Sequence, residues 1–175
     1  MSLEIGKGRI IRRPGGMGVN GDKNSRGRTR EDRIAILSLG TRLHDSLIAA
    51  NEVEDADPSI GVTVADGRFM KPLDTELIRQ LVDEHSVLIT IEEGSIGGFG
   101  DHVMHFLSDD GAFDDGNLRF RSMVLPDELF EAGTQQEQYD MAGINHEHIR
   151  ELVQKLTLKR LKVPVLDMAE VQVKE

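Results

Sequence analysis

One stretch of this chain constrains its fold more than any other: an apolar run, then a glycine-rich turn, then a helical pattern. Residues 87–91 read Val-Leu-Ile-Thr-Ile, a β-branched run that is typical of a strand buried on both faces. The backbone can then turn sharply at four glycines, Gly94, Gly97, Gly98 and Gly100. Phe99, Val103, Phe106 and Leu107 recur at helical spacing, which predicts a helix that packs back on the sheet.

The same alternation of strand and helix patterns runs along most of the chain. Apolar runs predict strands over residues 3–12, 34–39, 60–65, 87–91 and 118–124. The last of these alternates apolar and polar residues, which is typical of an edge strand with one wet face. Strands that alternate with helices, joined by right-handed crossovers, favour an α/β protein. We therefore predict a three-layer αβα sandwich with a mostly parallel, mixed sheet of about five strands.

Capping residues place the starts of the intervening helices. Helix starts are indicated at Thr41, Asp74, Thr134 and Asn145. The sequence Thr134-Gln-Gln-Glu137 is a capping box, and Gly143 ends the short helix that follows it. The helix that begins at Thr41 is expected to give way to a polar surface loop over residues 51–58.

Composition and charge limit the classes of function. The chain has 175 residues and no cysteine, so disulfides, thiol catalysis and cysteine-ligated zinc are excluded. No apolar run approaches the roughly 18 residues that a membrane helix needs. The net charge is −10, with nine Lys or Arg against four Asp or Glu in residues 1–33 and 12 against 27 in the rest. An acidic body of this kind repels nucleic acid and anionic membranes, so we expect neither as a partner.

The chain divides into three parts by composition. Residues 1–33 are expected to hold an N-terminal strand and a flexible Gly/Arg-rich insertion, Pro14 to Arg30. We expect the basic residues of this whole arm to be solvated, and phosphate binding by them is the alternative. Residues 34–162 form the α/β domain, and residues 163–175 are a tail without a clear period. Deleting the insertion should leave the fold intact, because loop length changes stability only slowly.

Two neighbouring carboxylates, Glu92 and Glu93, follow the buried strand. Successive residues of a strand point to opposite faces, so these two side chains cannot share a proton as a catalytic acid and base. We expect one of them to form a structural ion pair with Arg68, which leaves the end of the preceding strand. A catalytic carboxylate is the alternative for either residue.

The glycine turn is the other candidate site. Free backbone N–H groups at the start of a helix favour an anion, so Gly94, Ser95, Gly97, Gly98 and Gly100 could bind a phosphate or contact a partner. The spacing matches neither the dinucleotide fingerprint nor a P-loop. The histidine pairs 102/105 and 146/148 lack an apparent third ligand, so we expect surface or partly buried histidines rather than a metal site. We assign no catalytic, cofactor-binding or metal-binding residue.

Three stretches together resemble a known family. Ile34 to Thr41 (IAILSLGT), Val64 to Asp74 (VADGRFMKPLD) and Val87 to Gly100 (VLITIEEGSIGGFG) look like the C-terminal domain of 1-deoxy-D-xylulose-5-phosphate synthase. Leu3 to Gly8, Val124 to Asp127 and Gln138 to Gly143 also fit, in order. The resemblance extends, more distantly, to the C-terminal domain of transketolases and of the β chains of 2-oxoacid dehydrogenases. Two departures are the length of the Pro14 to Arg30 segment and Gly67, where the family usually has a small side chain; we expect the glycine to be harmless at a turn.

The resemblance implies a reaction for the parent enzyme and not for this part of it. The family condenses pyruvate with glyceraldehyde 3-phosphate, with loss of carbon dioxide, on thiamine diphosphate and Mg²⁺, and its product feeds isoprenoid, thiamine and pyridoxal synthesis. In that family the cofactor and the catalytic histidines belong to two preceding domains of a homodimer. The family's catalytic residues have no counterpart here.

Two functions of different classes follow. The first is the non-catalytic C-terminal domain of such a synthase, which packs against the N-terminal domains and contributes to packing in the homodimer. This domain is expected to be inactive alone. The alternative is a stand-alone α/β module that binds an organic anion or phosphate at Gly94–Gly100. The cytoplasm is the expected compartment, with a plastid stroma as the alternative.

Overall fold

A computed structural model describes residues 3–17 and 33–158 of the chain. Its strands are β1 (Arg9–Arg13), β2 (Gly16–Met17), β3 (Arg33–Ser38), β4 (Gly61–Asp66), β5 (Val87–Ser95) and β6 (Arg119–Leu125). Its helices are α1 (Leu43–Ala56), preceded by a 3-10 turn (Gly40–Arg42), α2 (Thr75–Glu84), α3 (Phe99–Asp109), α4 (Gln135–Met141) and α5 (His146–Leu158). No helix among the described residues is long and apolar enough to cross a membrane.

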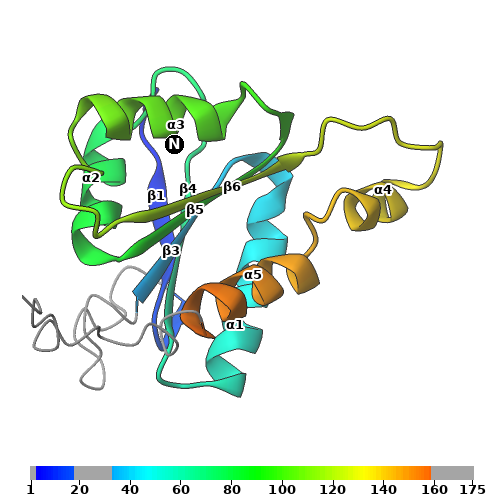
Figure 1. Ribbon diagram of the computed structural model, residues 1–175, viewed down its shortest axis with the longest axis horizontal. Helices are drawn as coiled ribbons and strands as arrows, with labels where there is room; N and C mark the ends of the chain where they lie inside the picture. Colours follow the sequence, from blue (N-terminus) through cyan, green and yellow to red (C-terminus); the bar gives the residue numbers. More distant parts are fainter. Residues whose placement is uncertain (1–2, 18–32, 159–175) are drawn as a thin grey trace, which may run out of the picture.

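The sheet confirms the predicted fold class. Its strand order is β2-β1-β4-β3-β5-β6, in which β3 to β6 run parallel and β1 runs antiparallel to β4. The sheet therefore contains five strands near the expected positions and one two-residue addition, β2. The first strand begins at Arg9 rather than at Leu3. Helices cover both faces, so the architecture is the predicted three-layer αβα sandwich (Figure 1).

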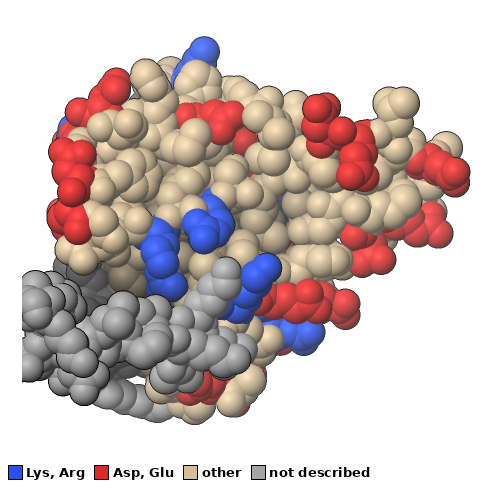
Figure 2. All heavy atoms as spheres, viewed as in Figure 1, with Lys and Arg blue, Asp and Glu red and all other residues tan. Residues whose placement is uncertain are grey.

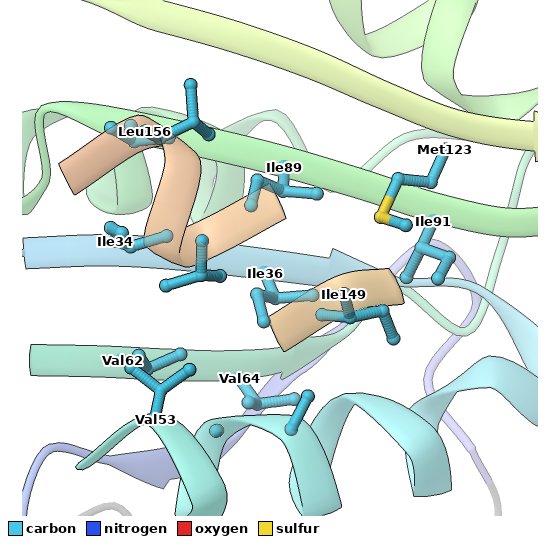
Figure 3. Close-up of a cluster of buried hydrophobic side chains, with 14 of the residues drawn as sticks. Ile34, Ile36, Val53, Val62, Val64, Ile89, Ile91, Met123, Ile149 and Leu156 are labelled. Carbon is cyan, nitrogen blue, oxygen red and sulfur yellow. The ribbon is translucent and has the colours of Figure 1, made fainter. Parts of the chain in front are cut away.

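One apolar layer lies between the sheet and the helices α1 and α5. Alternate residues of four parallel strands point into it, and Figure 3 shows them meeting side chains from both helices. The fully buried members include Ile36, Ile89, Ile149 and Val153. Each such side chain contributes about 1.5–3 kcal/mol on burial, so this layer fixes the two helices against the sheet.

The second apolar layer lies under α2 and α3. It contains the predicted inner face of α2, which is Leu77, Ile78, Leu81 and Val82. Phe99, Val103 and Leu107 of α3 are also buried there, as the helical spacing predicted, while Phe106 is half-buried.

The caps are confirmed at three of the four predicted helix starts. Asp74 accepts a hydrogen bond from the Leu77 N–H at 3.1 Å, and Thr134 and Glu137 form the predicted capping box. Asn145 accepts from the His148 N–H at 3.1 Å. The prediction at Thr41 is wrong, because Arg42 holds the N-cap position of α1 and no side chain caps that helix.

Helix α1 extends beyond the predicted limit. A polar loop was expected over residues 51–58, but the helix continues to Ala56. The added turns carry Val53, which is 1% exposed, and Glu54, whose carboxylate binds the edge of the sheet. Packing and ion pairing thus outweigh the polar composition of this segment.

Two consecutive arginines of β1 attach this strand to helices on opposite faces of the sheet. Arg12 forms a bidentate pair with Glu54 of α1 (Nη2 to Oε2, 2.9 Å; Nη1 to Oε1, 3.1 Å), and Arg13 pairs with Glu84 of α2 (Nη1 to Oε2, 2.6 Å). Both arginines are about 95% buried. The prediction that the basic residues before position 33 are solvated is therefore wrong for these two, because neighbours on a strand point to opposite faces.

The predicted flexible insertion is only partly described. Gly16 and Met17 pair with Arg13 and Arg12 as strand β2, so the hairpin occupies the first residues of the segment that was expected to be loose. Residues 18–32 and the predicted tail, 163–175, lie outside the described residues.

Candidate functional site

Polar residues gather where the parallel strands end. Ser38, Asp66 and Ile91 are in register on β3, β4 and β5, so the segments that follow these strands meet at one edge of the sheet. Ligands of open α/β sheets bind at the carboxyl ends of the strands. This edge of the sheet is therefore the candidate functional site.

The glycine turn is built around a carboxylate of the chain itself. Glu92 is 5% exposed, and its Oε1 accepts a hydrogen bond from the Gly100 N–H at 2.9 Å. A Cβ atom at Gly98 or at Gly94 would lie 2.5 Å from Glu92 Oε2, so a side chain at either position would require the carboxylate to shift. The buried carboxylate occupies the space that these two side chains would need.

The anion that was considered for this turn is replaced by carboxylates of the chain itself. The carboxylate of Glu92, a residue of β5, lies at the start of α3, and Asp101 accepts a hydrogen bond from the Gly97 N–H. Negative charge at a helix N-terminus is stabilising. Ser95 is the last residue of β5 and is exposed. The turn of Gly94, Ser95, Gly97, Gly98 and Gly100 therefore holds two carboxylates where an external phosphate was considered possible.

Gly100 and Gly67 permit close packing at the same edge. A Cβ at Gly100 would lie 2.2 Å from Ser122 Oγ, and one at Gly67 would lie 2.9 Å from Phe99 Cζ. Gly67 was expected to be merely harmless. The aromatic ring beside it gives this glycine a packing role.

Glu93 joins a polar cluster on the opposite face from the α3 layer. Its Oε1 lies 3.3 Å from Arg42 Nε and accepts hydrogen bonds from the hydroxyls of Thr41 and Tyr139. The Arg42 guanidinium lies 3.5 Å from the centroid of the Tyr139 ring and 3.2 Å from Asp45 Oδ2. Arg42 is 4% exposed, so this cation is compensated by two carboxylates and an aromatic face. The cluster fastens α4 to the end of the sheet.

The predicted pair between Arg68 and Glu92 or Glu93 does not form. Arg68 Nε instead lies 3.7 Å from Asp66 Oδ2 of its own strand. The prediction took β4 and β5 as adjacent, but β3 lies between them in the sheet. Glu92 and Glu93 do point to different partners, as expected for neighbours on a strand.

Among the described residues, the histidines belong to no group that could hold a metal ion. The two pairs that the sequence singled out make local contacts, such as His105 with Asp109 (3.4 Å) and His148 with Asn145. Within residues 3–17 and 33–158, no group of three or more His, Asp or Glu side chains could hold a metal ion.

One buried histidine had no signal in the sequence. His85 is 1% exposed; its Nδ1 donates to the Leu81 carbonyl and its Nε2 accepts from the Thr63 hydroxyl, both at 2.7 Å. Burial lowers the pKa of His85 to about 4. A neutral imidazole is satisfied by these two bonds, so His85 is a core residue.

A hollow lies at the other end of the sheet, away from this cluster. It is bordered by the Arg79–Asp110 ion pair (2.6 Å) and by Asp83, Asp114 and Leu118. Arg79, the basic residue that borders the hollow, is half-exposed and already paired with Asp110, so we assign no ligand to the hollow.

These features define a class of domain: a three-layer αβα sandwich whose polar residues and glycine turn close the carboxyl end of a mixed sheet. A family model described as the transketolase C-terminal domain matches residues 24–149, most of the chain. The chain belongs to the family of transketolase C-terminal domains.

Solved structures agree with this assignment. The chain is similar to a structure titled "Split gene transketolase, inactive beta4 tetramer", with 25% identity and a TM-score of 0.67 over 91% of this chain and 45% of that one. A transketolase from Campylobacter jejuni subsp. jejuni NCTC 11168 shares the fold, with 14% identity and a TM-score of 0.51 over 73% of this chain and 17% of that one. The chain spans less than half the length of either protein.

Proposed function

We propose that this chain is the C-terminal, non-catalytic domain of a 1-deoxy-D-xylulose-5-phosphate synthase, and that it serves packing against the other domains and in a dimer. The observation that carries the proposal is where the three family-like stretches lie. Residues 34–41, 64–74 and 87–100 contain β3, the end of β4 and β5, which are neighbouring strands. Their ends therefore form one continuous surface.

The packing role is supported by how this surface is held. Glu92 fixes the start of α3, while Glu93 and Arg42 fix α4 through Tyr139. Side chains that are locked by buried partners present a surface of fixed shape, which suits an interdomain contact. The similar split gene transketolase structure is an inactive beta4 tetramer, which supports association of this domain with other subunits.

Thiamine diphosphate and Mg²⁺ are assigned, in this proposal, to the preceding domains. The residues described here do not fit either group. No cluster of metal ligands is present among them, and the helix N-terminus that could bind a diphosphate is filled by Glu92. The same filling argues against the alternative, a stand-alone module that binds a phosphate at Gly94–Gly100.

The test of the proposal is reconstitution. We expect that the chain, mixed with separately expressed thiamine diphosphate-binding domains of the same enzyme, restores carbon dioxide release from pyruvate and glyceraldehyde 3-phosphate. Positioning by a neighbouring domain is typically worth several kcal/mol, so the gain in rate should be at least about 100-fold. The matched control is the Arg42→Ala variant, which should restore less because α4 loses its attachment.

Two results would count against the proposal. Full activity of the cofactor-binding domains without this chain would remove its packing role. Ketol transfer between two sugar phosphates, without pyruvate decarboxylation, would place the chain in a transketolase and leave only the family assignment.

A further inference from the structure

The segment Asp127–Met141, here named the acidic arm, projects from the body of the domain beyond the end of β6 (Figure 1). Apart from Phe130 and Tyr139, every residue of the arm is exposed, and α4 within it contains no buried residue. Leu129 is fully exposed at 103% of its reference area. An ordered, capped segment that buries so little of its own apolar surface suits contact with another surface.

The arm carries five carboxylates and no Lys or Arg. Two of them have partners inside the domain: Glu137 belongs to the capping box and Asp140 accepts from Asn145. Asp127, Glu128 and Glu131 form no ion pair within the described part of the chain. The surface that covers the arm should therefore be positively charged.

Such a surface exists on the same domain, at the outer edge of β6. This strand is the last of the sheet, and no described strand pairs with its outer side. The Arg119 N–H donates inward to the Ser86 carbonyl, whereas the Phe120 carbonyl points outward and accepts from the Arg121 side chain at 2.6 Å. Because a parallel ladder alternates sides, the backbone N–H and C=O of Ser122 also point outward.

Positive side chains gather along this edge. Arg121 and Lys155 are exposed and form no ion pair within the described residues. Arg119 donates to the Leu156 carbonyl at 2.7 Å, so the end of α5, with Lys155, lies beside the start of β6. Figure 2 shows positive side chains along β6 and beside α5, and negative ones over the arm. We call Arg119, Arg121 and Lys155 the basic edge.

We propose that two copies of this chain associate through their β6 edges, antiparallel about a two-fold axis, with the acidic arm of each copy on the basic edge of the other. Antiparallel pairing places the end of one β6 beside the start of its partner's β6. The arm follows the end of β6, and Lys155 lies beside its start, so opposite charges meet twice in one symmetric contact.

The layers of the sandwich agree with this geometry. Arg119 contacts α5, and Tyr139 of the arm packs on the apolar layer of α1 and α5. A two-fold axis perpendicular to the sheet keeps equivalent layers of the two copies on the same side. The arm and the basic edge therefore lie in the same layer of the combined twelve-stranded sheet.

Local complementarity is needed because the net charge of −10 opposes association of two copies. The exposed N–H and C=O groups of an edge strand provide backbone pairing, and the charges provide register and specificity. Arg121, which covers the Phe120 carbonyl in the monomer, is free to pair with a carboxylate once a partner strand takes that carbonyl. The inference rests on the proposed packing role but on no reaction.

The first test compares two substitutions at one position of the full chain. Ser122→Pro removes an outward N–H without breaking a backbone hydrogen bond to β5. Ser122→Ala keeps the N–H and, like the proline, removes the hydroxyl that accepts from Thr90 Oγ1 of β5 at 3.3 Å. Sedimentation equilibrium should show a concentration-dependent dimer, with its dissociation constant raised at least about tenfold by Ser122→Pro and less than about threefold by Ser122→Ala. Equal effects of the two substitutions would overturn edge pairing, provided that thermal unfolding shows both variants folded.

The second test exchanges the charges. Arg121→Glu with Lys155→Glu should weaken the dimer at least about tenfold, and Asp127→Lys with Glu128→Lys should do the same. All four changes in one chain should restore the dimer, because both members of each contact have then changed sign and still carry opposite charges. A monomer at 0.5 mM, an absence of restoration, or a dimer that forms only after residues 159–175 are removed would each overturn the proposal. Both tests measure the mass of the assembly and not an activity. A failure of the proposed dimer can therefore be distinguished from a failure of the proposed function.

Discussion

Replacing Glu54 by alanine should lower the free energy of unfolding by about 3–5 kcal/mol. The carboxylate accepts four hydrogen bonds, two from Arg12 and two from the N–H groups of Gly15 and Val62. Arg12 is 3% exposed, so the substitution leaves a buried cation without its counter-ion. Chemical unfolding of the variant and of the wild type at pH 7 measures the difference.

The matched control for this prediction is Glu52→Ala on the same helix. Glu52 is one-third exposed and lies 3.6 Å from Arg150, so its loss should cost under about 1 kcal/mol. Equal costs of the two substitutions would show that the Arg12 pair is no more than a surface contact.

The cost of Glu54→Ala should also depend on pH. Burial alone would raise the pKa of Glu54, but the hydrogen bonds from Arg12, Val62 and Gly15 outweigh it and lower the pKa below 4.5. A lowered carboxyl pKa stabilises the fold above the unfolded value, and this stabilisation is lost as pH falls through the folded value. The difference between wild type and variant should therefore shrink below about pH 4.5.

His85 should make the fold sensitive to mild acid. Its pKa is about 4 in the folded protein, against 6.5 in an unfolded chain. The unfolded state therefore binds more protons between these values, so stability is complete above pH 6.5 and falls as pH drops toward 4. At 1.36 kcal/mol for each pKa unit, the loss from this residue amounts to about 3 kcal/mol.

The measurement for His85 is the free energy of unfolding at intervals between pH 7 and 4, for wild type and for His85→Gln. The variant should lose less stability over this range, by about 3 kcal/mol. His105→Gln, at an exposed position of α3, should follow the wild-type profile. Parallel profiles for wild type and His85→Gln would contradict a neutral, buried imidazole.

Local patterns predicted the elements of this fold well, because they depend on neighbours in sequence. The spacing of Leu77, Ile78 and Leu81 gave the inner face of α2, and the Thr134 capping box gave the start of α4. The predicted helix α1 was too short, because the last turns are stabilised by a contact of Glu54 with the distant strand β1, which the local sequence does not show.

The site was harder to predict because it depends on the order of strands. Sequence alone did not show that β3 lies between β4 and β5, and the expected partner of Arg68 was wrong for that reason. The glycines were correctly placed at a strand end. The sequence did not show why glycines occupy these positions. The Glu92 side chain folds back on the turn, and its carboxylate lies where their side chains would be.

The polar cluster at the sheet edge was missed for a similar reason. Arg42, Glu93 and Tyr139 come from segments that are far apart in the chain, and none of them belongs to a motif. The one available signal was the strand-end position of Glu93, which marks a place where distant segments meet.

The most direct test of the central claim is calorimetric titration of this chain with thiamine diphosphate and Mg²⁺. In the proposed function the cofactor belongs to other domains, and the helix N-terminus at the glycine turn is filled by Glu92. We therefore expect no binding heat at cofactor concentrations up to 1 mM. Binding tighter than about 100 μM, roughly −5.5 kcal/mol, would contradict this expectation and show that this domain carries a cofactor site.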